Sequence, residues 1–205
     1  MIVDPNIKRL VDRAVEFHGH MCPGLMTGVR ASQIALRELG GRAQDEELVA
    51  IVECDNCSVD AIQVLLGCTF GKGNLLYRDY GKTAYTFIRR LDGRAVRVAS
   101  RPRPPQQMPD GYGELREKAQ TGAATEDEQE SFREMNRRRD AAILEMPEDE
   151  LFAVRALQVP VPREAQIRHS VVCEECGELV METRSRRLAG RPYCIPCFER
   201  LDGRW

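Results

Sequence analysis

Cysteine and histidine residues, gathered in two parts of this 205-residue chain, carry the side chains best suited to metal or thiol chemistry. Four of the eight cysteines lie before residue 70, and the other four lie between residues 173 and 197. The N-terminal residues lack the apolar stretch of a secretory leader, so we expect a cytoplasmic protein. Because structural disulfides are rare in that compartment, the cysteines indicate metal binding or redox chemistry at two separate sites.

The C-terminal cysteines form two Cys-x-x-Cys pairs that are separated by seventeen residues. Two such pairs can bring four thiolates to one tetrahedral zinc ion, which accepts sulfur ligands readily. Since so short a segment cannot bury much of a core, we expect the metal to supply most of its folding free energy. A pair of redox-active dithiols is the alternative. The pattern predicts a structural zinc finger with four ligands, Cys173, Cys176, Cys194 and Cys197.

Four arginines lie inside the loop of this predicted finger: Arg184, Arg186, Arg187 and Arg191. Arginines in a cluster can contact phosphates, which would make the finger a nucleic-acid module. No aromatic residues are interleaved with them in a recognisable binding pattern. The sequence therefore favours a solvated or protein-docking face, and nucleic acid is not an expected partner.

The N-terminal group begins with the motif His18-Gly19-His20-Met21-Cys22-Pro23. On a continuous helix, residues two apart point to nearly opposite sides, so His18 and His20 could not bind one metal there. Gly19 permits a chain reversal, and a proline disfavours helical geometry at the residue before it, here Cys22. We therefore expect a break between two helices that carries metal ligands.

A second group of candidates, Cys54, Cys57 and Asp60, surrounds the start of a predicted helix. The free amides and the dipole of a helix N-terminus stabilise a thiolate, which suits metal binding and nucleophilicity alike. Asp60 could bind the metal itself or accept a hydrogen bond from a ligating imidazole. A buried thiol that only fills the core is the alternative, and it is the default for Cys68.

Together these residues predict a second transition-metal site, for which the sequence leaves zinc, iron and nickel open. Its candidate ligands are His18, His20, Cys22, Cys57 and Asp60, with Cys54 and Cys68 as weaker candidates.

The segment around Gly67, Gly71 and Gly73 has the glycines and the lysine of a phosphate-binding loop but not their spacing. Three residues instead of four separate Gly67 from Gly71, and a glycine follows Lys72 where the motif needs serine or threonine. We interpret it as a turn that carries Lys72 and Asn74 toward a cleft, where they could bind an anionic group. A plain surface turn is the alternative.

Residue periodicity predicts helices at residues 5–18, 23–39 and 58–67, and a strand at 48–54. Asp4 and Pro5 are typical of a helix start, and Ser58 could cap the third helix. Residues 82–99 predict a β-hairpin around Asp92-Gly93. Thr125 and Glu128 fit the capping box of a charged helix that reaches about Met146, and residues 151–159 predict another strand. The prolines at 160 and 162 indicate a linker between domains at 1–162 and 163–205.

The balance of charge gives a formal net charge of -2, which indicates neither a nucleic-acid surface nor an acidic tail. Apolar runs are too short to cross a bilayer, so no membrane partner is expected.

Three motifs resemble the FmdE/FwdE family, the E-type subunits of formylmethanofuran dehydrogenase: FHGHMCPG at 17–24, CSVDAIQVLLGCTFGKGNL at 57–75 and YGKTAYTF at 80–87. The C-terminal cysteine pairs resemble the DksA/TraR-type finger that extends many members. The resemblance implies an α+β domain with helices packed on a mixed or antiparallel sheet (FwdE/GAPDH-domain-like), plus a treble-clef or ribbon-like finger. It also implies a homodimer associated with a molybdenum or tungsten oxidoreductase of methanogenesis.

By position, the functional matches to the family are His18, His20, Cys22, Cys57, Asp60, Cys68, Lys72, Gly73 and Asn74, with Cys54 matching less surely. FmdE proteins are not the catalytic component of the dehydrogenase, so the resemblance supplies no active site.

Three functions follow as hypotheses. The first is a metal-binding accessory protein linked to a molybdenum or tungsten oxidoreductase. The second is a stand-alone enzyme in which an open His/Cys metal site activates water or a small-molecule substrate. The third is a regulatory protein that acts through its finger. The sequence favours the first and names neither a substrate nor a catalytic residue.

Overall fold

The computed structural model describes residues 5–102 and 109–201, and it divides the chain into two compact units, Met1–Glu164 and Ala165–Trp205. Asp4, expected to cap the first helix, lies outside the described residues. Each unit contains one of the two groups of cysteines.

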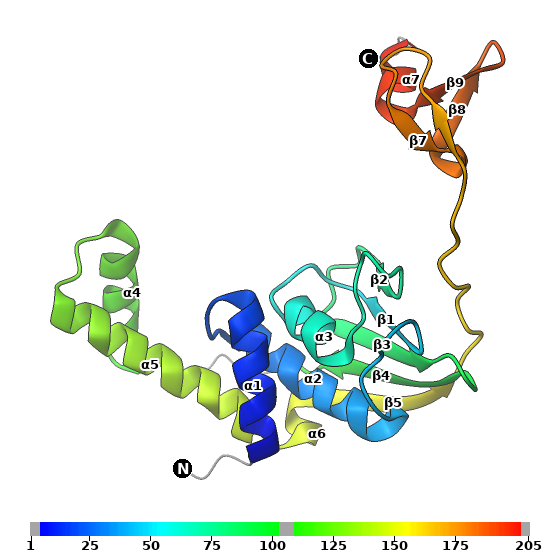
Figure 1. Cartoon of the computed structure of the whole chain (residues 1–205). Helices are drawn as coiled ribbons and strands as arrows, with labels where there is room; N and C mark the ends of the chain where they lie inside the picture. Colours follow the sequence, from blue (N-terminus) through cyan, green and yellow to red (C-terminus); the bar gives the residue numbers. More distant parts are fainter. Residues whose placement is uncertain (1–4, 103–108, 202–205) are drawn as a thin grey trace. The chain divides into compact units, whose positions relative to one another are not determined.

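Three helices form one layer of the first unit (Figure 1). Their bounds are Pro5–His18 (α1), Pro23–Leu39 (α2) and Ser58–Leu66 (α3). α1 ends at the expected glycine, since Gly19 has φ 93°, and α3 ends at Gly67 with φ 71°. The cap of α3 differs from the expectation: Cys57 occupies the N-cap position, and Ser58 is the first helical residue.

A five-stranded sheet in the order β2-β1-β3-β4-β5 forms the second layer. The strands are Leu48–Val52 (β1), Leu75–Tyr77 (β2), Ala84–Arg89 (β3), Arg94–Ser100 (β4) and Phe152–Gln158 (β5). β1 and β2 are parallel and the other pairs are antiparallel, so the sheet is mixed, which confirms the α+β prediction. β3 and β4 form the predicted hairpin, whose turn ends at Gly93 with φ 71°.

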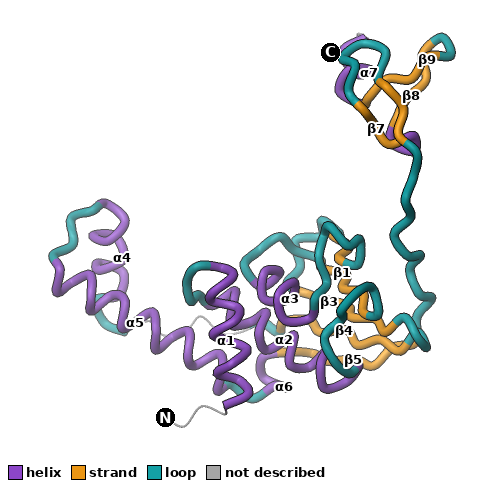
Figure 2. The backbone as a smooth tube through the Cα atoms, viewed as in Figure 1, coloured by secondary structure: helices purple, strands orange, loops and turns teal. Residues whose placement is uncertain are grey.

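The main core lies between the helical layer and one face of the sheet (Figure 2). Because side chains alternate along a strand, Ala50 and Val52 of β1 pack toward the helices, and Val49 faces the opposite side. Tyr85 and Phe87 of β3 lie in the same core and are almost fully buried. This core fixes the starts of α2 and α3 without any contribution from a metal.

The remaining helices are Tyr112–Thr121 (α4), Glu126–Glu145 (α5) and Glu148–Leu151 (α6). α5 begins with the predicted capping box, in which Thr125 and Glu128 exchange hydrogen bonds. α4 and α6 were not predicted, because α4 buries only Tyr112 and α6 is a single turn, so neither has an apolar period. α5 is held to α2 by Arg30, which donates to the carbonyl oxygen of Leu144 at 2.5 Å.

The second unit is built from two short hairpins and a terminal helix. Its elements are Ser170–Val172 (β6), Leu179–Met181 (β7), the 3-10 turn Glu182–Arg184 (η1), Ser185–Leu188 (β8), Arg191–Cys194 (β9) and Ile195–Leu201 (α7). Among the described residues of this unit, the buried ones are Cys173 and Cys197. A knuckle, a hairpin and a helix in this order fit the treble-clef alternative.

In the part of the chain that the structure describes, no helix has both the length and the apolar character needed to cross a membrane.

Candidate metal centres

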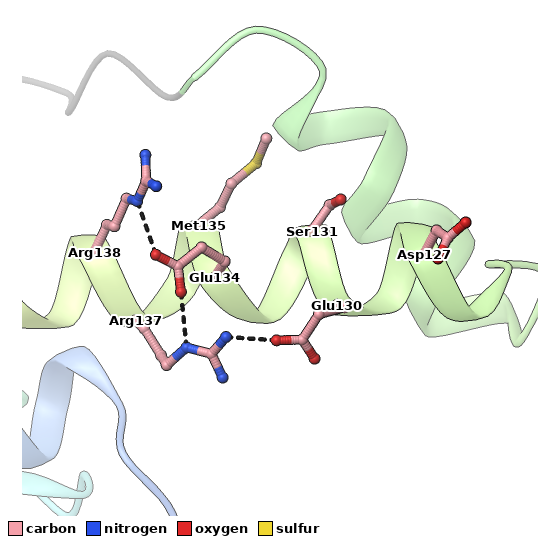
Figure 3. Close-up of a pocket in the computed structure, with 7 residues that line it drawn as sticks. All are labelled: Asp127, Glu130, Ser131, Glu134, Met135, Arg137 and Arg138. Atoms are coloured by element: carbon pink, nitrogen blue, oxygen red, sulfur yellow. Dashed lines mark hydrogen bonds and ion pairs between the residues drawn. The ribbon is translucent and has the colours of Figure 1, made fainter.

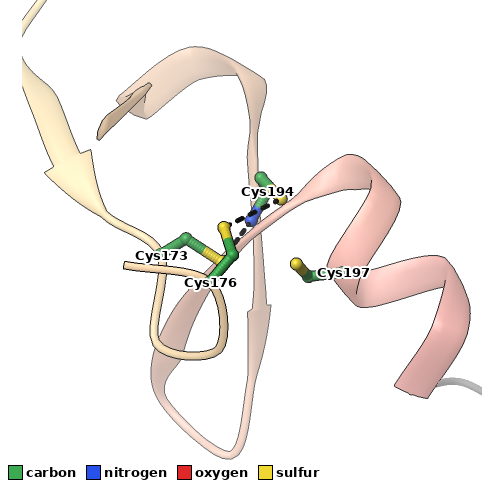
Figure 4. Close-up of side chains that lie close together, drawn as sticks. All are labelled: Cys173, Cys176, Cys194 and Cys197. Atoms are coloured by element: carbon green, nitrogen blue, oxygen red, sulfur yellow. Dashed lines mark hydrogen bonds between the residues drawn. The ribbon is translucent and has the colours of Figure 1, made fainter. Parts of the chain in front are cut away.

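The four C-terminal cysteines meet in one cluster, in which their sulfur atoms all lie within 4.8 Å of one another (Figure 4). The Sγ atoms of Cys176 and Cys194 are 3.9 Å apart. A tetrahedral zinc ion with Zn–S bonds of about 2.3 Å separates its sulfur ligands by about 3.8 Å. The donor set and its spacing therefore fit one zinc ion.

Each ligand of this cluster comes from a short local element. The first pair lies in the knuckle between β6 and β7, where Gly177 has φ 75° and donates to the carbonyl of Cys173 at 3.0 Å. Cys194 ends β9, and Cys197 lies in the first turn of α7. Glycine permits this left-handed turn without strain, and the turn returns the chain to the metal.

The surroundings of the four thiols separate their acidities. Backbone N–H groups of Cys176 and Cys194 donate to the sulfur of Cys173 and lower its pKa to about 6. The thiol of Cys194 raises the pKa of Cys197 to about 12 through its hydrogen bond, and burial adds to the effect. A bound cation favours all four thiolates, since it offsets the repulsion between them.

The N-terminal cluster consists of His18, Cys22 and Cys57, whose ligand atoms also lie within 4.8 Å of one another. The Nε2 atom of His18 is 3.7 Å from the sulfur of Cys22. Zinc bonds of about 2.0 and 2.3 Å in tetrahedral geometry give about 3.6 Å for such a pair. One imidazole and two thiols thus have the types and the spacing of a three-ligand transition-metal site.

Three helix ends supply these ligands. His18 is the last residue of α1, Cys22 is the N-cap of α2, and Cys57 is the N-cap of α3. The sulfur of Cys22 accepts from the N–H of Leu25 at 3.4 Å, which favours the thiolate. Burial is the larger effect and raises the pKa of Cys22, and the neighbouring Cys57 thiol raises it further. Two thiols at helix N-termini are suited to lose their protons when a cation binds.

Asp60 accepts a hydrogen bond from the His18 ring. Its Oδ2 atom is 2.7 Å from Nδ1, and its other oxygen is 3.4 Å from the side-chain amide of Gln63. A carboxylate on Nδ1 fixes the tautomer in which Nε2 carries a lone pair, and it raises the basicity of that nitrogen. Of the two roles considered for Asp60, the geometry favours orientation of the histidine, with Nε2 directed toward the thiols.

Two glycines of α2 allow the thiols to meet. A Cβ atom on Gly24 would lie 3.2 Å from the Cβ of Cys57, and one on Gly28 would collide with the backbone of Ser58. Helix α2 therefore approaches the start of α3 more closely than any residue with a side chain would allow. This requirement was not predicted from the sequence, although glycines four apart in a helix are its visible signal.

A buried hydrogen-bond network supports the turn that carries Cys57. Tyr85 of β3 donates to the Oγ of Ser58 at 2.6 Å, and Asn56 accepts from both the N–H and the hydroxyl of Ser58. Ser58 and Tyr85 have no measurable exposure. Ser58 therefore serves to anchor the turn to the sheet, and it does not cap the helix as expected.

His20 lies beside this cluster and outside its three-ligand group. Its ring centroid is 4.6 Å from that of His18, at an interplanar angle of 34°, and its side chain is exposed. Cys54 is buried with its sulfur 4.0 Å from the hydroxyl of Ser58, and Cys68 is buried with its sulfur near the carbonyl of Leu48. Burial raises the pKa of Cys68 to about 12, which disfavours a thiolate there.

Lys72 and Asn74, the candidates for anion binding, hydrogen-bond to the protein backbone. The ammonium of Lys72 donates to the carbonyls of Gln44 and Asp45. The amide of Asn74 is fully buried; it donates to Asp45 and Leu48, and its oxygen accepts from the N–H of Thr69. These contacts hold the glycine-rich turn against the loop before β1, and the structure does not bring either residue to the His18 cluster.

Asp140 of α5 is a buried acid that was not predicted from the sequence. Only 2% of the residue is exposed, and its nearest donors, on Arg139, are 3.4 Å away. Burial raises its pKa, while Arg139 and His20 act to lower it, and its charge contributes to the raised pKa of Cys22. Helix α5 thus brings a carboxylate from the second half of the chain near the N-terminal cluster, and no local motif marks it.

A surface hollow lies elsewhere on α5 and is lined by Asp127, Glu130, Ser131, Glu134, Met135, Arg137 and Arg138 (Figure 3). Its charges neutralise one another. Arg137 bonds Glu130 at 2.5 Å and Glu134 at 3.0 Å, and Arg138 bonds Glu134 at 2.9 Å. This is the solvated face of a charged helix.

The fold and its sites define a class of protein: an α+β domain with a histidine–cysteine cluster at three helix ends, followed by a four-cysteine zinc-finger unit. Residues 17–153 match the family model described as "FmdE, Molybdenum formylmethanofuran dehydrogenase operon". The chain belongs to the FmdE family. Residues 166–203 match the prokaryotic dksA/traR C4-type zinc finger, which agrees with zinc as the metal of the C-terminal cluster.

Two relatives extend this comparison. The chain is 37% identical over 201 residues to a probable S-adenosyl-L-methionine-binding protein of Archaeoglobus fulgidus, covering 92% of this chain and 55% of that protein. The chain thus spans about half the length of that curated relative. In structure it is similar to an FmdE-like protein of a tungsten formylmethanofuran dehydrogenase from Syntrophus aciditrophicus, with a TM-score of 0.57 and 21% identity over 97% of this chain and 94% of that one.

Proposed function

We propose that His18, Cys22 and Cys57 form a transition-metal centre with an open coordination position, and that this protein is a metal-binding accessory component of a molybdenum or tungsten oxidoreductase. The convergence of one imidazole and two thiols from three helix ends carries the proposal. The hydrogen bond between Asp60 and His18 supports it, because metal-bound histidines commonly have such a partner on their other nitrogen.

Three protein ligands are typical of zinc sites that keep a fourth position for water or substrate, whereas structural sites have four. When bound, the metal would supply Lewis acidity at that position. The protein would contribute the oriented imidazole and two thiolates, with the buried carboxylate of Asp140 nearby. His20, exposed beside His18, would flank the approach of a small molecule.

The link to an oxidoreductase rests on the family, whose description names the operon of molybdenum formylmethanofuran dehydrogenase. A second candidate function rests on the archaeal relative, which is named a probable S-adenosyl-L-methionine-binding protein. In that case the protein would act by itself, and the open metal centre would lie at or near the binding site for adenosylmethionine.

The test is metal analysis of the full chain purified without added metal, in parallel with Cys22→Ser/Cys57→Ser and Cys173→Ser/Cys197→Ser double variants. We expect two metals per chain and the loss of one in each variant. Asp60→Asn should retain the fold and weaken metal binding at the N-terminal centre by about 10–100-fold, since the histidine loses its orienting acceptor. One metal per chain that the Cys22→Ser/Cys57→Ser change leaves in place would overturn the proposal.

Calorimetry with adenosylmethionine separates the two functions. Binding to the metal-loaded chain that is lost in the Cys22→Ser/Cys57→Ser variant would favour the stand-alone function. No binding, together with two metals per chain, would favour the accessory function.

A further inference from the structure

We propose that the outer face of the β8–β9 hairpin in the finger binds single-stranded nucleic acid, through Arg186 and Arg191 with Tyr193 between them. The inference is independent of the function proposed for the N-terminal centre. Its basis is the strand register, which brings an aromatic side chain among arginines that are separated from it in the sequence.

The register defines the two faces of the hairpin. Arg186 lies opposite Tyr193, and Leu188 lies opposite Arg191. Side chains directly opposite each other in an antiparallel pair lie on the same face, so these four residues share one surface. Cys194 belongs to the other face, which is turned toward the metal cluster. The face with the two arginines is therefore directed away from the zinc site.

The hairpin holds this surface in a defined geometry. Its two turn residues, Ala189 and Gly190, have φ values of 49° and 80°, which is the left-handed pattern of a tight two-residue β-turn. Glu174 bonds Arg191 at 2.9 Å and keeps its guanidinium near the hairpin. Arg186 is exposed and donates to the carbonyl of Ser185, and among the described residues no acidic partner of Arg186 is found.

The charge of the segment selects an anionic ligand. Residues 183–198 contain four arginines and no acidic residue, whereas residues 173–182 contain four glutamates and no basic residue. The finger therefore has a basic end at the hairpin and an acidic end at the first knuckle. A polyanion would be attracted to the hairpin and repelled by the knuckle, which orients it on the finger.

The aromatic residue favours nucleic acid over an acidic peptide. Guanidinium groups bind phosphate oxygens, and a tyrosine ring flanked by them can stack on an unpaired base. Leu188, which is 39% exposed, extends the apolar part of the same surface. A base can reach the ring only if it is unstacked, so single strands fit this face better than a duplex.

The experiment measures the fluorescence anisotropy of labelled twelve-nucleotide single strands, oligo(dT) and oligo(U), with the full zinc-loaded chain at low salt. We expect Arg186→Gln to weaken binding roughly 5–10-fold and to reduce the slope of log K against log salt by about 0.7, as for one lost phosphate contact. Tyr193→Ala should weaken binding on the order of 10-fold, and Tyr193→Phe should retain it, because the phenyl ring still stacks.

Arg187→Gln is the matched control. It removes the same charge one residue away, but Arg187 lies on the other face and donates to the carbonyl of Gly190. Its effect should stay within about 2-fold, since no phosphate contact is lost. Zinc content is measured for every variant, and the two exposed arginine variants decide the question if Tyr193→Ala loses its zinc.

Two results would overturn the proposal: no binding of either strand, or equal losses for Arg186→Gln and Arg187→Gln, which would indicate unspecific charge attraction. Tighter binding of a poly-glutamate peptide or of a duplex would also overturn it, in favour of an acidic protein or of double-stranded nucleic acid.

Discussion

The two cysteine-containing clusters are built by opposite strategies. In the finger, all four ligands lie within 25 residues, on turns and strand ends that contact one another locally. In the FmdE domain, His18 and Cys22 are close in the chain, but Cys57 joins them only because α2 packs against the start of α3. One cluster organises its unit, and the other lies on a unit that is already organised.

This difference determines what each metal can do. The finger buries almost nothing except two of its own ligands, so the metal bond replaces the missing core and all coordination positions are used. The FmdE domain has a large apolar core that holds the helix ends in place. A site supported in this way can leave one coordination position to a ligand, because its stability does not depend on a complete shell.

Metal removal should have the largest effect, and it should separate the two units. A strong zinc chelator is expected to unfold the finger and to leave the FmdE domain folded, because only the finger depends on metal for its core. Hydrogen exchange reports both units in one sample: protection should disappear in residues 170–201 and persist in β1, β3 and β4. Loss of protection in the sheet as well would show that the comparison between the units is wrong.

The close approach of α2 and α3 gives the next largest effect. Gly28→Ala should destabilise the FmdE domain by about 3 kcal/mol, because the new methyl group collides with the backbone of Ser58 and the helices must separate. Metal binding at the N-terminal centre should weaken with it, while the zinc of the finger is unchanged. Urea unfolding followed by circular dichroism gives the free energy, and metal analysis gives the occupancy.

Gly113→Ala is the control, since a Cβ atom at Gly113 meets nothing within 4 Å. It lies in α4, where alanine is favoured, and should change the free energy of unfolding by less than about 1 kcal/mol. A Gly28→Ala protein as stable as this control would contradict the role given to the helix contact.

The smallest effect is the pH dependence of the FmdE domain through Glu53 and Arg97. Glu53 is 7% exposed, and its hydrogen bonds from Arg97, one of them 2.9 Å, lower its pKa below the ordinary value. The pair therefore stabilises the domain fully above the unfolded-state pKa near 4.3, and this stabilisation is lost as the pH falls through the lower folded-state pKa. Arg97→Gln should cost about 1–2 kcal/mol at neutral pH and flatten the profile between pH 5 and 3.

Thermal unfolding of the two proteins at a series of pH values measures this effect. The finger contains no such buried pair among its described residues, so its own acid sensitivity should follow zinc release and be the same in both proteins. Parallel profiles for the native chain and the Arg97→Gln variant would contradict the assignment.

Local patterns predicted the elements that local physics decides. The glycines at 19 and 67 end their helices, the Thr125–Glu128 box begins α5, and the hairpin turns at Asp92-Gly93. Helix α4 escaped prediction because its packing on α5 uses a single pair of rings, Tyr112 and Phe132, and leaves no apolar stripe in the sequence. The prediction of Ser58 as a cap was wrong because its partner, Tyr85, is distant in the chain.

The sequence by itself determined the four-cysteine finger and the set of residues from which an N-terminal centre could be built. Spacing is enough for the finger, because its ligands are held by turns a few residues long. Only the tertiary structure decided that Cys57 joins His18 and Cys22, that Asp60 orients the histidine, and that Asn74 is occupied by backbone carbonyls. It also placed Tyr193 beside Arg186. These relations depend on helix packing and strand register between distant segments, which residue spacing along the chain does not encode.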